Sequence, residues 1–151
     1  MKLLIASDHA GFQLKEALKK NRPDIEWTDL GTMSEESTPY PKHAQALCEK
    51  LIDTHTHAEL TNPLGVLICG SGVGVSMQAN RYMGIRAALC WSEEVAVLSR
   101  QHNAANVLCL GSRLVKPEDA LKIFDAWSRT PFEGGRHAER IKMMDEECEC
   151  C

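Results

Sequence analysis

Short apolar segments alternate with longer segments of helical periodicity along the whole chain. The predicted strands are residues 2–7, 25–29, 64–69, 86–90 and 106–110. The predicted helices are residues 12–20, 41–53, 73–81, 92–100, 117–127 and 135–146. Residues 64–69 of the third strand and 107–110 of the fifth are continuously apolar, which is typical of parallel strands that are covered on both faces. This alternation predicts a single α/β domain with a doubly wound, five-stranded parallel sheet and a C-terminal helix.

In such a sheet the ligand crevice lies at the carboxyl ends of the strands, where the chain order reverses. Polar or glycine-rich residues follow several of the predicted strands, namely residues 7–9, 69–72 and 111–113. Because these strand ends share one edge of the sheet, we expect the functional residues to gather there.

Composition narrows the class of protein. The chain has 151 residues, seven cysteines and a formal net charge of -4. A chain of this length buries roughly two-thirds of its unfolded surface, so it needs no disulfide or metal for stability. The odd cysteine count predicts free thiols in a reducing, cytoplasmic compartment. The absence of a dense Lys/Arg run argues against a nucleic-acid partner, and no apolar segment is long enough to cross a membrane.

A glycine-rich turn follows the third strand and leads into a helix. Its residues are Cys69, Gly70, Ser71, Gly72, Val73 and Gly74. Such a turn lets the backbone approach a ligand and offers free N–H groups to an anion, although it could also be simple strand-to-helix punctuation. It is neither a P-loop nor a dinucleotide-binding signature, because the Lys-Ser/Thr pair is missing and the third glycine comes one residue early.

Helix N-termini stabilise thiolates, so Cys69 is a candidate base or nucleophile. The alternative is a small apolar core residue, and that is the interpretation we favour for Cys48 and Cys109. Cys90 lies at a strand end, a position compatible with either role, and it is also interpreted as structural.

Two histidines are candidates for chemistry. His9 follows Asp8 at the end of the first strand, and His102 lies just past the predicted helix 92–100. Spacing alone leaves each of them equally compatible with a titratable site residue and with a hydrogen-bonded structural one.

Arg136 and Arg140 are four residues apart on the last predicted helix, so their guanidinium groups share a face as in a phosphate clamp. The alternative is a surface helix whose arginines pair with Glu133 and Glu139. Arg113, after the fifth strand, is a third candidate cation.

We predict no metal site. His55 and His57 lack a carboxylate or thiol cluster at ligand spacing, and they are interpreted as part of a solvated loop. The domain is predicted to cover residues 1–145. Residues 146–151, with Cys148, Cys150 and Cys151, are interpreted as a disordered acidic tail.

Six short segments, taken in order, make the chain resemble a known family. They are SDHAGF at 7–12, CGSGVG at 69–74, AN at 79–80, SRQHN at 99–103, GSR at 111–113 and FEGGRH at 132–137. Together they resemble the type B ribose-5-phosphate isomerases over residues 1–145. That family also contains galactose-6-phosphate isomerase subunits and relatives acting on allose 6-phosphate, and its members share a Rossmann-like α/β/α sandwich.

The resemblance implies an aldose–ketose isomerase that needs no cofactor or metal. It implies that Cys69 shuttles the proton and that His102 opens the sugar ring. The implied sugar contacts are Asp8, His9, Asn103 and the loop Gly70 to Gly74, and the implied phosphate ligands are Arg136 and Arg140 with Arg113 and His9 nearby. Family members are homodimers or dimers of dimers whose active sites draw on both subunits.

Substrate choice is the main open alternative. Cys69 together with Val75, where one branch has a Glu base, places the chain with the thiol-dependent members. A complete set of site residues in one chain favours ribose 5-phosphate. The alternative of the same chemistry is a hexose 6-phosphate isomerase for allose or galactose 6-phosphate, and the alternative of another class is a non-catalytic sugar-phosphate sensor.

Overall fold

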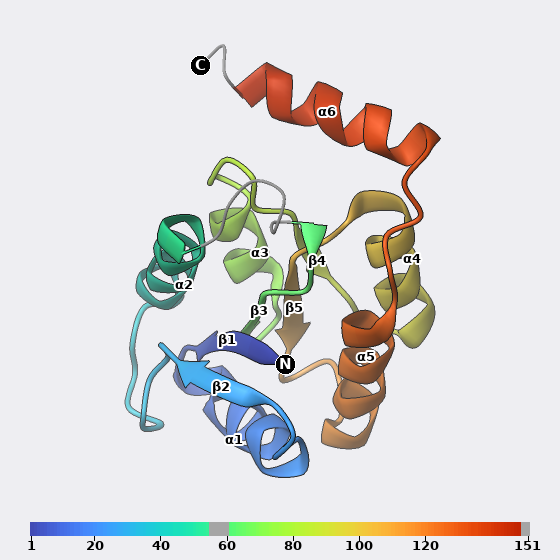
Figure 1. The fold of residues 1–151 in the computed structure, drawn as a ribbon. Coiled ribbons are helices and arrows are strands. Elements are labelled where there is room, and N and C mark those ends of the chain that lie inside the picture. The colour runs from blue at the N-terminus through green and yellow to red at the C-terminus, as the bar shows by residue number, and fades with distance from the viewer. Residues whose placement is uncertain (55–60, 149–151) are drawn as a thin grey trace.

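The computed structural model describes residues 1–54 and 61–148 and contains one parallel sheet (Figure 1). Its strands are β1 (Lys2–Ser7), β2 (Glu26–Asp29), β3 (Gly65–Cys69), β4 (Ala87–Leu89) and β5 (Val107–Gly111). The strand order is β2-β1-β3-β5-β4, and every neighbouring pair is parallel. The five-stranded parallel sheet predicted from the apolar segments is therefore confirmed.

Helices cover both faces of the sheet. They are α1 (Phe12–Asn21), α2 (Tyr40–Thr54), α3 (Val73–Ala79), α4 (Glu93–Asn103), α5 (Pro117–Arg129) and α6 (Arg136–Cys148), with a short 3-10 turn η1 (His9–Gly11). α1, α4 and α5 share a buried cluster with one face, and α2 and α3 share a cluster with the other. The predicted α/β/α sandwich is thus confirmed, and α6 lies outside both helix layers (Figure 1).

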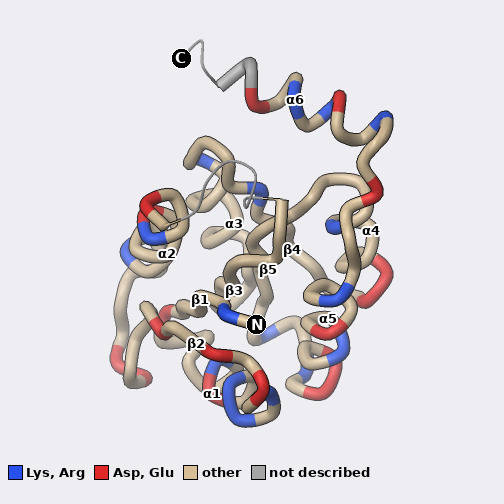
Figure 2. The backbone as a smooth tube through the Cα atoms, viewed as in Figure 1, with Lys and Arg blue, Asp and Glu red and all other residues tan. Residues whose placement is uncertain are grey.

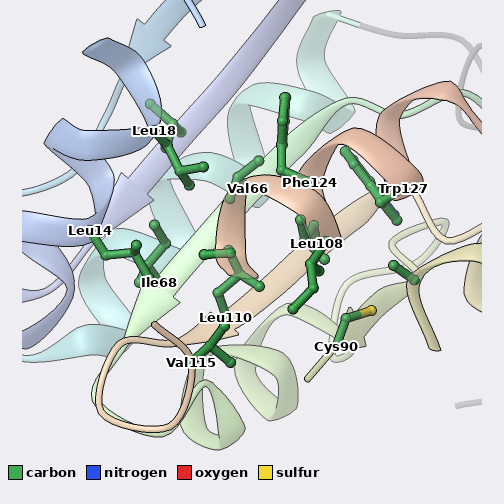
Figure 3. Close-up of a cluster of buried hydrophobic side chains, with 14 of the residues drawn as sticks. Leu14, Leu18, Val66, Ile68, Cys90, Leu108, Leu110, Val115, Phe124 and Trp127 are labelled. Atoms are coloured by element: carbon green, nitrogen blue, oxygen red, sulfur yellow. The ribbon is translucent and has the colours of Figure 1, made fainter. Parts of the chain in front are cut away.

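The two central strands, β3 and β5, are buried along their whole length. Successive side chains point to opposite faces, so Ile68 and Leu110 meet α1 and α5 (Figure 3), whereas Leu67 meets α2 and α3. Burial on both faces is the reason that these strands are continuously apolar in the sequence.

Three of the cysteines are core residues. Cys48, Cys90 and Cys109 are fully buried free thiols. Burial raises the pKa of Cys48 to about 12 and that of Cys90 to about 11, and it raises the pKa of Cys109 well above the ordinary value. Their interpretation as structural residues is confirmed. The residue pair His55 and His57, and the end of the predicted tail (149–151), lie outside the described residues.

The ends of the parallel strands form two opposite edges of the sheet, a carboxyl edge and an amino edge. β1 leads outward to β2 on one side, whereas β3 leads to β4 and β5 on the other, so the chain order reverses between β1 and β3. The carboxyl ends of these strands form the crevice edge. α4 begins after β4 and ends before β5, so its last turn lies at the opposite, amino edge. None of the helices in residues 1–54 and 61–148 has both the length and the apolar character that crossing a bilayer requires.

Candidate active site

A cavity of about 350 Å³ opens at the crevice edge. It is lined by Asp8, His9, Ala10, Tyr40, Cys69, Gly70, Ser71, Gly74, Arg113 and Leu114. These residues follow β1, β3 and β5, as the position of the crevice in a doubly wound sheet predicts. A second cavity, also of about 350 Å³, lies at the amino edge between the start of β4 and α6, and Asn103 lines it. The second cavity contains no thiol, so the cavity at the crevice edge is the candidate active site.

The thiol of Cys69 is held by the backbone of its own turn. It is buried, and its Sγ accepts a hydrogen bond of 3.1 Å from the N–H of Gly72. The Ser112 N–H donates to the Cys69 carbonyl at 2.9 Å, and the Arg113 N–H donates to the Gly70 carbonyl at 3.0 Å. The turn is therefore fixed to the segment after β5, and it directs the positive end of an N–H dipole at the sulfur atom.

The glycines of this turn are required by its close packing. Gly72 has a φ of +76°, which favours glycine, and a Cβ there would lie 2.5 Å from Leu89 Cδ1. A Cβ on Gly74 would lie 2.6 Å from the ring of Tyr40. Backbone conformation and space together explain the glycine-rich pattern.

Gly72→Ala is expected to destabilise the protein more than Gly134→Ala does. Both glycines have positive φ, +76° and +68°, so both substitutions incur the left-handed cost of about 1–2 kcal/mol. At Gly72 the methyl group also meets Leu89 and the backbone of Leu110, whereas at Gly134 nothing lies within 4 Å. Urea unfolding of the two variants measures the difference, and equal losses would contradict the steric explanation.

Asp8 and His9 form one side of the cavity. Asp8 is buried and precedes the 3-10 turn, and its Oδ1 accepts a hydrogen bond of 3.0 Å from the N–H of Gly11, the last residue of that turn. His9 is half-buried, and its Nδ1 lies 3.2 Å from the backbone N–H of Thr38. Asp8 thus fixes the turn that presents His9 to the cavity.

Arg113 is the cation among the residues that line the cavity. Its guanidinium group lies over Gly70, where a Cβ would be 3.2 Å from Arg113 Cζ. Tyr40 also lines the cavity, and no motif in the sequence marks it as a site residue. It follows the irregular segment after β2, and neither its spacing nor its neighbours indicate which way that segment returns to the sheet.

The remaining candidate residues lie away from this cavity. His102 and Asn103 are in the last turn of α4 at the amino edge, and Arg136 and Arg140 are exposed on α6. β5 lies between the two edges, and a strand of its length spans roughly 15 Å. Within one chain, the structure therefore brings Cys69, Asp8, His9 and Arg113 together and keeps His102 apart from them.

The predicted end of the fourth helix is wrong. α4 continues to Asn103, three residues beyond the predicted residue 100, so His102 lies within the helix rather than past it. The helix ends at Ala104, which has a φ of +46° and whose N–H donates to the Arg100 carbonyl. This position usually takes glycine, and an alanine there gives no stop signal in the sequence.

The chain's relationship to known proteins agrees with this geometry. A sequence model of the family described as Ribose/Galactose Isomerase matches residues 3–144. The chain belongs to this family. It is therefore an isomerase.

Relatives within the isomerase family are similar over almost their whole length. The chain is 44% identical to a probable ribose-5-phosphate isomerase B of Mycoplasma pneumoniae over 142 residues, which cover 92% of this chain and 90% of the relative. It is 41% identical to the ribose-5-phosphate isomerase B of Escherichia coli, covering 95% and 93% of the two chains. A crystal structure of the Mycoplasma genitalium enzyme with bound ribulose-5-phosphate superimposes with a TM-score of 0.88 at 39% identity, covering 98% of this chain and 96% of that chain.

The candidate residues at the amino edge have their own organisation. The His102 ring stacks on the His137 ring with centroids 4.3 Å apart and planes inclined by 8°. Burial, together with the positive charges of Arg136 and Arg140 nearby, lowers the pKa of His137. The possible ligand atoms of His102, Glu133 and His137 lie within 4.8 Å of one another. However, parallel rings do not aim their nitrogens at one point, and the two arginines repel a cation, so we interpret this group as a pair of stacked imidazoles.

Arg136 and Arg140 are available for an anion. Within the described part of the chain, neither guanidinium group forms an ion pair, so the alternative pairing with Glu133 and Glu139 is not observed. Figure 2 shows basic positions along α6, outside the body of the sandwich.

Proposed function

We propose that the chain interconverts ribose 5-phosphate and ribulose 5-phosphate through an enediolate. The observation that carries this proposal is the Cys69 thiol in the crevice cavity, with its Sγ 3.1 Å from the Gly72 N–H and with Arg113 on the cavity wall. The bound ribulose-5-phosphate of the Mycoplasma genitalium relative supports the choice of a pentose phosphate.

The thiolate of Cys69 is the base in this proposal. It takes the proton from C2 of the open-chain aldose, and the released electron pair forms the C1–C2 double bond while the C1 carbonyl oxygen becomes negative. Return of the proton to C1, with transfer of the O2 proton to O1, gives the ketose. Backbone N–H groups of the turn Gly70 to Gly74 stabilise the charge that develops on the oxygens.

Opening of the sugar ring requires a second acid–base group. A proton must move between the anomeric hydroxyl and the ring oxygen, and an imidazole suits this step near neutral pH. We assign it to His102, with Asn103 beside it as a sugar contact. Asp8 and His9 contact the sugar from the crevice side.

We further propose that the site is completed by a second copy of the chain. His102, Asn103, Arg136 and Arg140 belong to the amino edge of their own sheet, and α6 lies outside both layers of its own sandwich (Figure 1). In a two-fold symmetric dimer the same surface of each chain faces the other. These residues of each chain would then reach the cavity of its partner, which gives two equivalent sites. A dimer, or a dimer of dimers, in the cytoplasm is the assembly that this proposal requires.

Arg136→Met or Arg140→Met is expected to raise KM for the sugar phosphate by about 10- to 100-fold, because a hydrogen bond to a charged group contributes about 1.5–3 kcal/mol. The turnover number should change much less, since the phosphate lies away from the reacting carbons. Initial rates over a range of substrate concentrations measure the effect. Arg129→Met, an exposed arginine at the end of α5, is the matched control and should leave KM unchanged.

A panel of aldose phosphates with five and six carbons, assayed in EDTA, tests the proposed substrate. Ribose 5-phosphate is expected to give the largest kcat/KM, and Cys69→Ala should abolish the activity. A preference for allose or galactose 6-phosphate would show that the substrate is a hexose phosphate and not a pentose phosphate. Binding of sugar phosphates without any turnover would instead indicate a sensor.

A further inference from the structure

The cavity histidine His9 is connected to a buried histidine through the segment between β2 and α2. Nδ1 of His9 lies 3.2 Å from the backbone N–H of Thr38, and also 3.2 Å from the Thr38 carbonyl. The side chain of the same threonine continues the connection, because Thr38 Oγ1 lies 3.0 Å from Nε2 of His43. Thr38 therefore joins His9, in the cavity wall, to His43, in the first turns of α2.

The direction of these hydrogen bonds follows from the surroundings of His43. This imidazole is 8% exposed, and burial lowers its pKa, so it is neutral near pH 7. It also hydrogen-bonds the backbone of Leu30, an interaction that favours the protonated ring and therefore uses a ring N–H as donor. With Nδ1–H given to Leu30, Nε2 is left as an acceptor, and the hydroxyl of Thr38 donates to it.

Leu30 is itself anchored to the sheet. Its N–H donates to the carbonyl of Ile5 in β1 at 2.8 Å. The connection therefore runs from the central sheet through Leu30, His43 and Thr38 to the imidazole in the cavity. It restrains a segment, residues 30–39, that otherwise has no helix or strand to hold it.

We propose that His43, acting through Thr38, positions the imidazole of His9 and sets its tautomer. In the proposed tautomer the Thr38 N–H donates to Nδ1 of His9, which places the ring proton on Nε2; the other tautomer would donate Nδ1–H to the Thr38 carbonyl, also 3.2 Å away. That N–H is then the donor that His9 offers to a sugar hydroxyl or a phosphate oxygen of the substrate. His43 and Thr38 are positioning residues, and they do not touch the substrate. The inference rests on the proposed function for the substrate, but the tautomer of His9 can be measured without any substrate.

Two pairs of variants separate positioning from folding. Thr38→Val removes the hydroxyl and keeps the shape and the backbone N–H, whereas Thr38→Ser restores the hydroxyl. His43→Phe keeps a buried ring and loses both nitrogens, whereas His43→Gln supplies one acceptor and one donor. If His43→Phe does not fold, Thr38→Val decides, because it exchanges a single hydroxyl for a methyl group.

Two measurements on each variant test the proposal. Two-dimensional ¹H–¹⁵N NMR of the substrate-free protein reports the tautomer of His9, and steady-state kinetics report kcat and KM. In the wild type, His9 is expected as the Nε2–H tautomer. In Thr38→Val and His43→Phe a mixture of tautomers is expected, with kcat/KM about 5-fold lower, the effect of losing one hydrogen bond of about 1 kcal/mol. Thr38→Ser and His43→Gln should restore both values.

The outcomes are distinct from those for the proposed function. A wild-type His9 tautomer in both Thr38→Val and His43→Phe overturns the inference, and so does a changed tautomer with unchanged kcat/KM. Absence of isomerase activity in the wild-type protein would instead overturn the proposed function, while the tautomer measurement would still decide whether His43 and Thr38 set the state of His9.

Discussion

Replacing Cys69 with serine is expected to lower kcat by about 10²- to 10⁴-fold, the contribution typical of a positioned acid–base group. Serine is close in size and still accepts the hydrogen bond from the Gly72 N–H, so the turn after β3 should keep its conformation. Its hydroxyl, however, is a much weaker acid than a thiol and does not form the anionic base that the proposed step uses. Turnover of ribose 5-phosphate, compared with the thermal unfolding midpoint of the same preparation, measures the change.

Cys48→Ala is the matched control for this substitution. Cys48 is also a buried thiol, but burial raises its pKa to about 12, so it is not ionised at neutral pH. Its replacement should lower stability through lost packing in the α2 layer and leave kcat unchanged at temperatures where the variant is folded. A wild-type kcat in Cys69→Ser would remove Cys69 from the proton transfer.

Two inactive variants are expected to restore activity when they are combined in one dimer. In a dimer of Cys69→Ser with His102→Asn, one site carries both substitutions and the other carries neither, provided that each site takes Cys69 from one chain and His102 from its partner. Random assembly then gives about half mixed dimers, each with one intact site of two, and about a quarter of the wild-type activity. Co-expression of the two variants with different affinity tags isolates the mixed dimers for assay.

The control pairs two substitutions from the same half-site. Cys69 and Arg113 line one cavity of one chain, so a mixed dimer of Cys69→Ser and Arg113→Met has a defect in each of its two sites. This combination should remain at the low activity of the separate variants. If activity were restored by the control pair and not by Cys69→Ser with His102→Asn, this result would contradict a site that takes Cys69 from one chain and His102 from its partner.

The fold could be predicted because each buried strand is marked by its apolar residues. Residues 64–69 and 107–110 are continuously apolar because helices cover both faces of the sheet, so the pattern in the sequence identifies these strands as buried. Helix ends were harder to place, since they depend on local backbone conformation. α4 ends at Ala104, which adopts a left-handed backbone conformation. Glycine is the usual residue at such a helix end, so the alanine gives no signal in the sequence that the helix stops there.

The candidate site was predictable in its residue types and less so in its geometry. Cys69 and the glycines could be identified because a strand, a tight turn and a helix follow one another in sequence. The placement of His102 at the opposite edge follows from the direction of α4, which the alternation of strands and helices already implies. Tyr40, which lines the cavity, and Thr38 and His43, which lie behind His9, could not be found in this way. Their placement depends on an irregular segment before α2 whose path is set by hydrogen bonds to β1 and His9.

Exchange of the substrate's C2 proton with solvent tests most directly whether Cys69 transfers that proton. In D₂O containing EDTA, ¹H NMR of ribose 5-phosphate with the wild-type protein is expected to show conversion to ribulose 5-phosphate with deuterium appearing at C1. Cys69→Ser at the same concentration should show neither change on the same timescale. Deuterium incorporation by Cys69→Ser at the wild-type rate, or ribose 5-phosphate left unchanged by the wild-type protein, would contradict the proposed reaction.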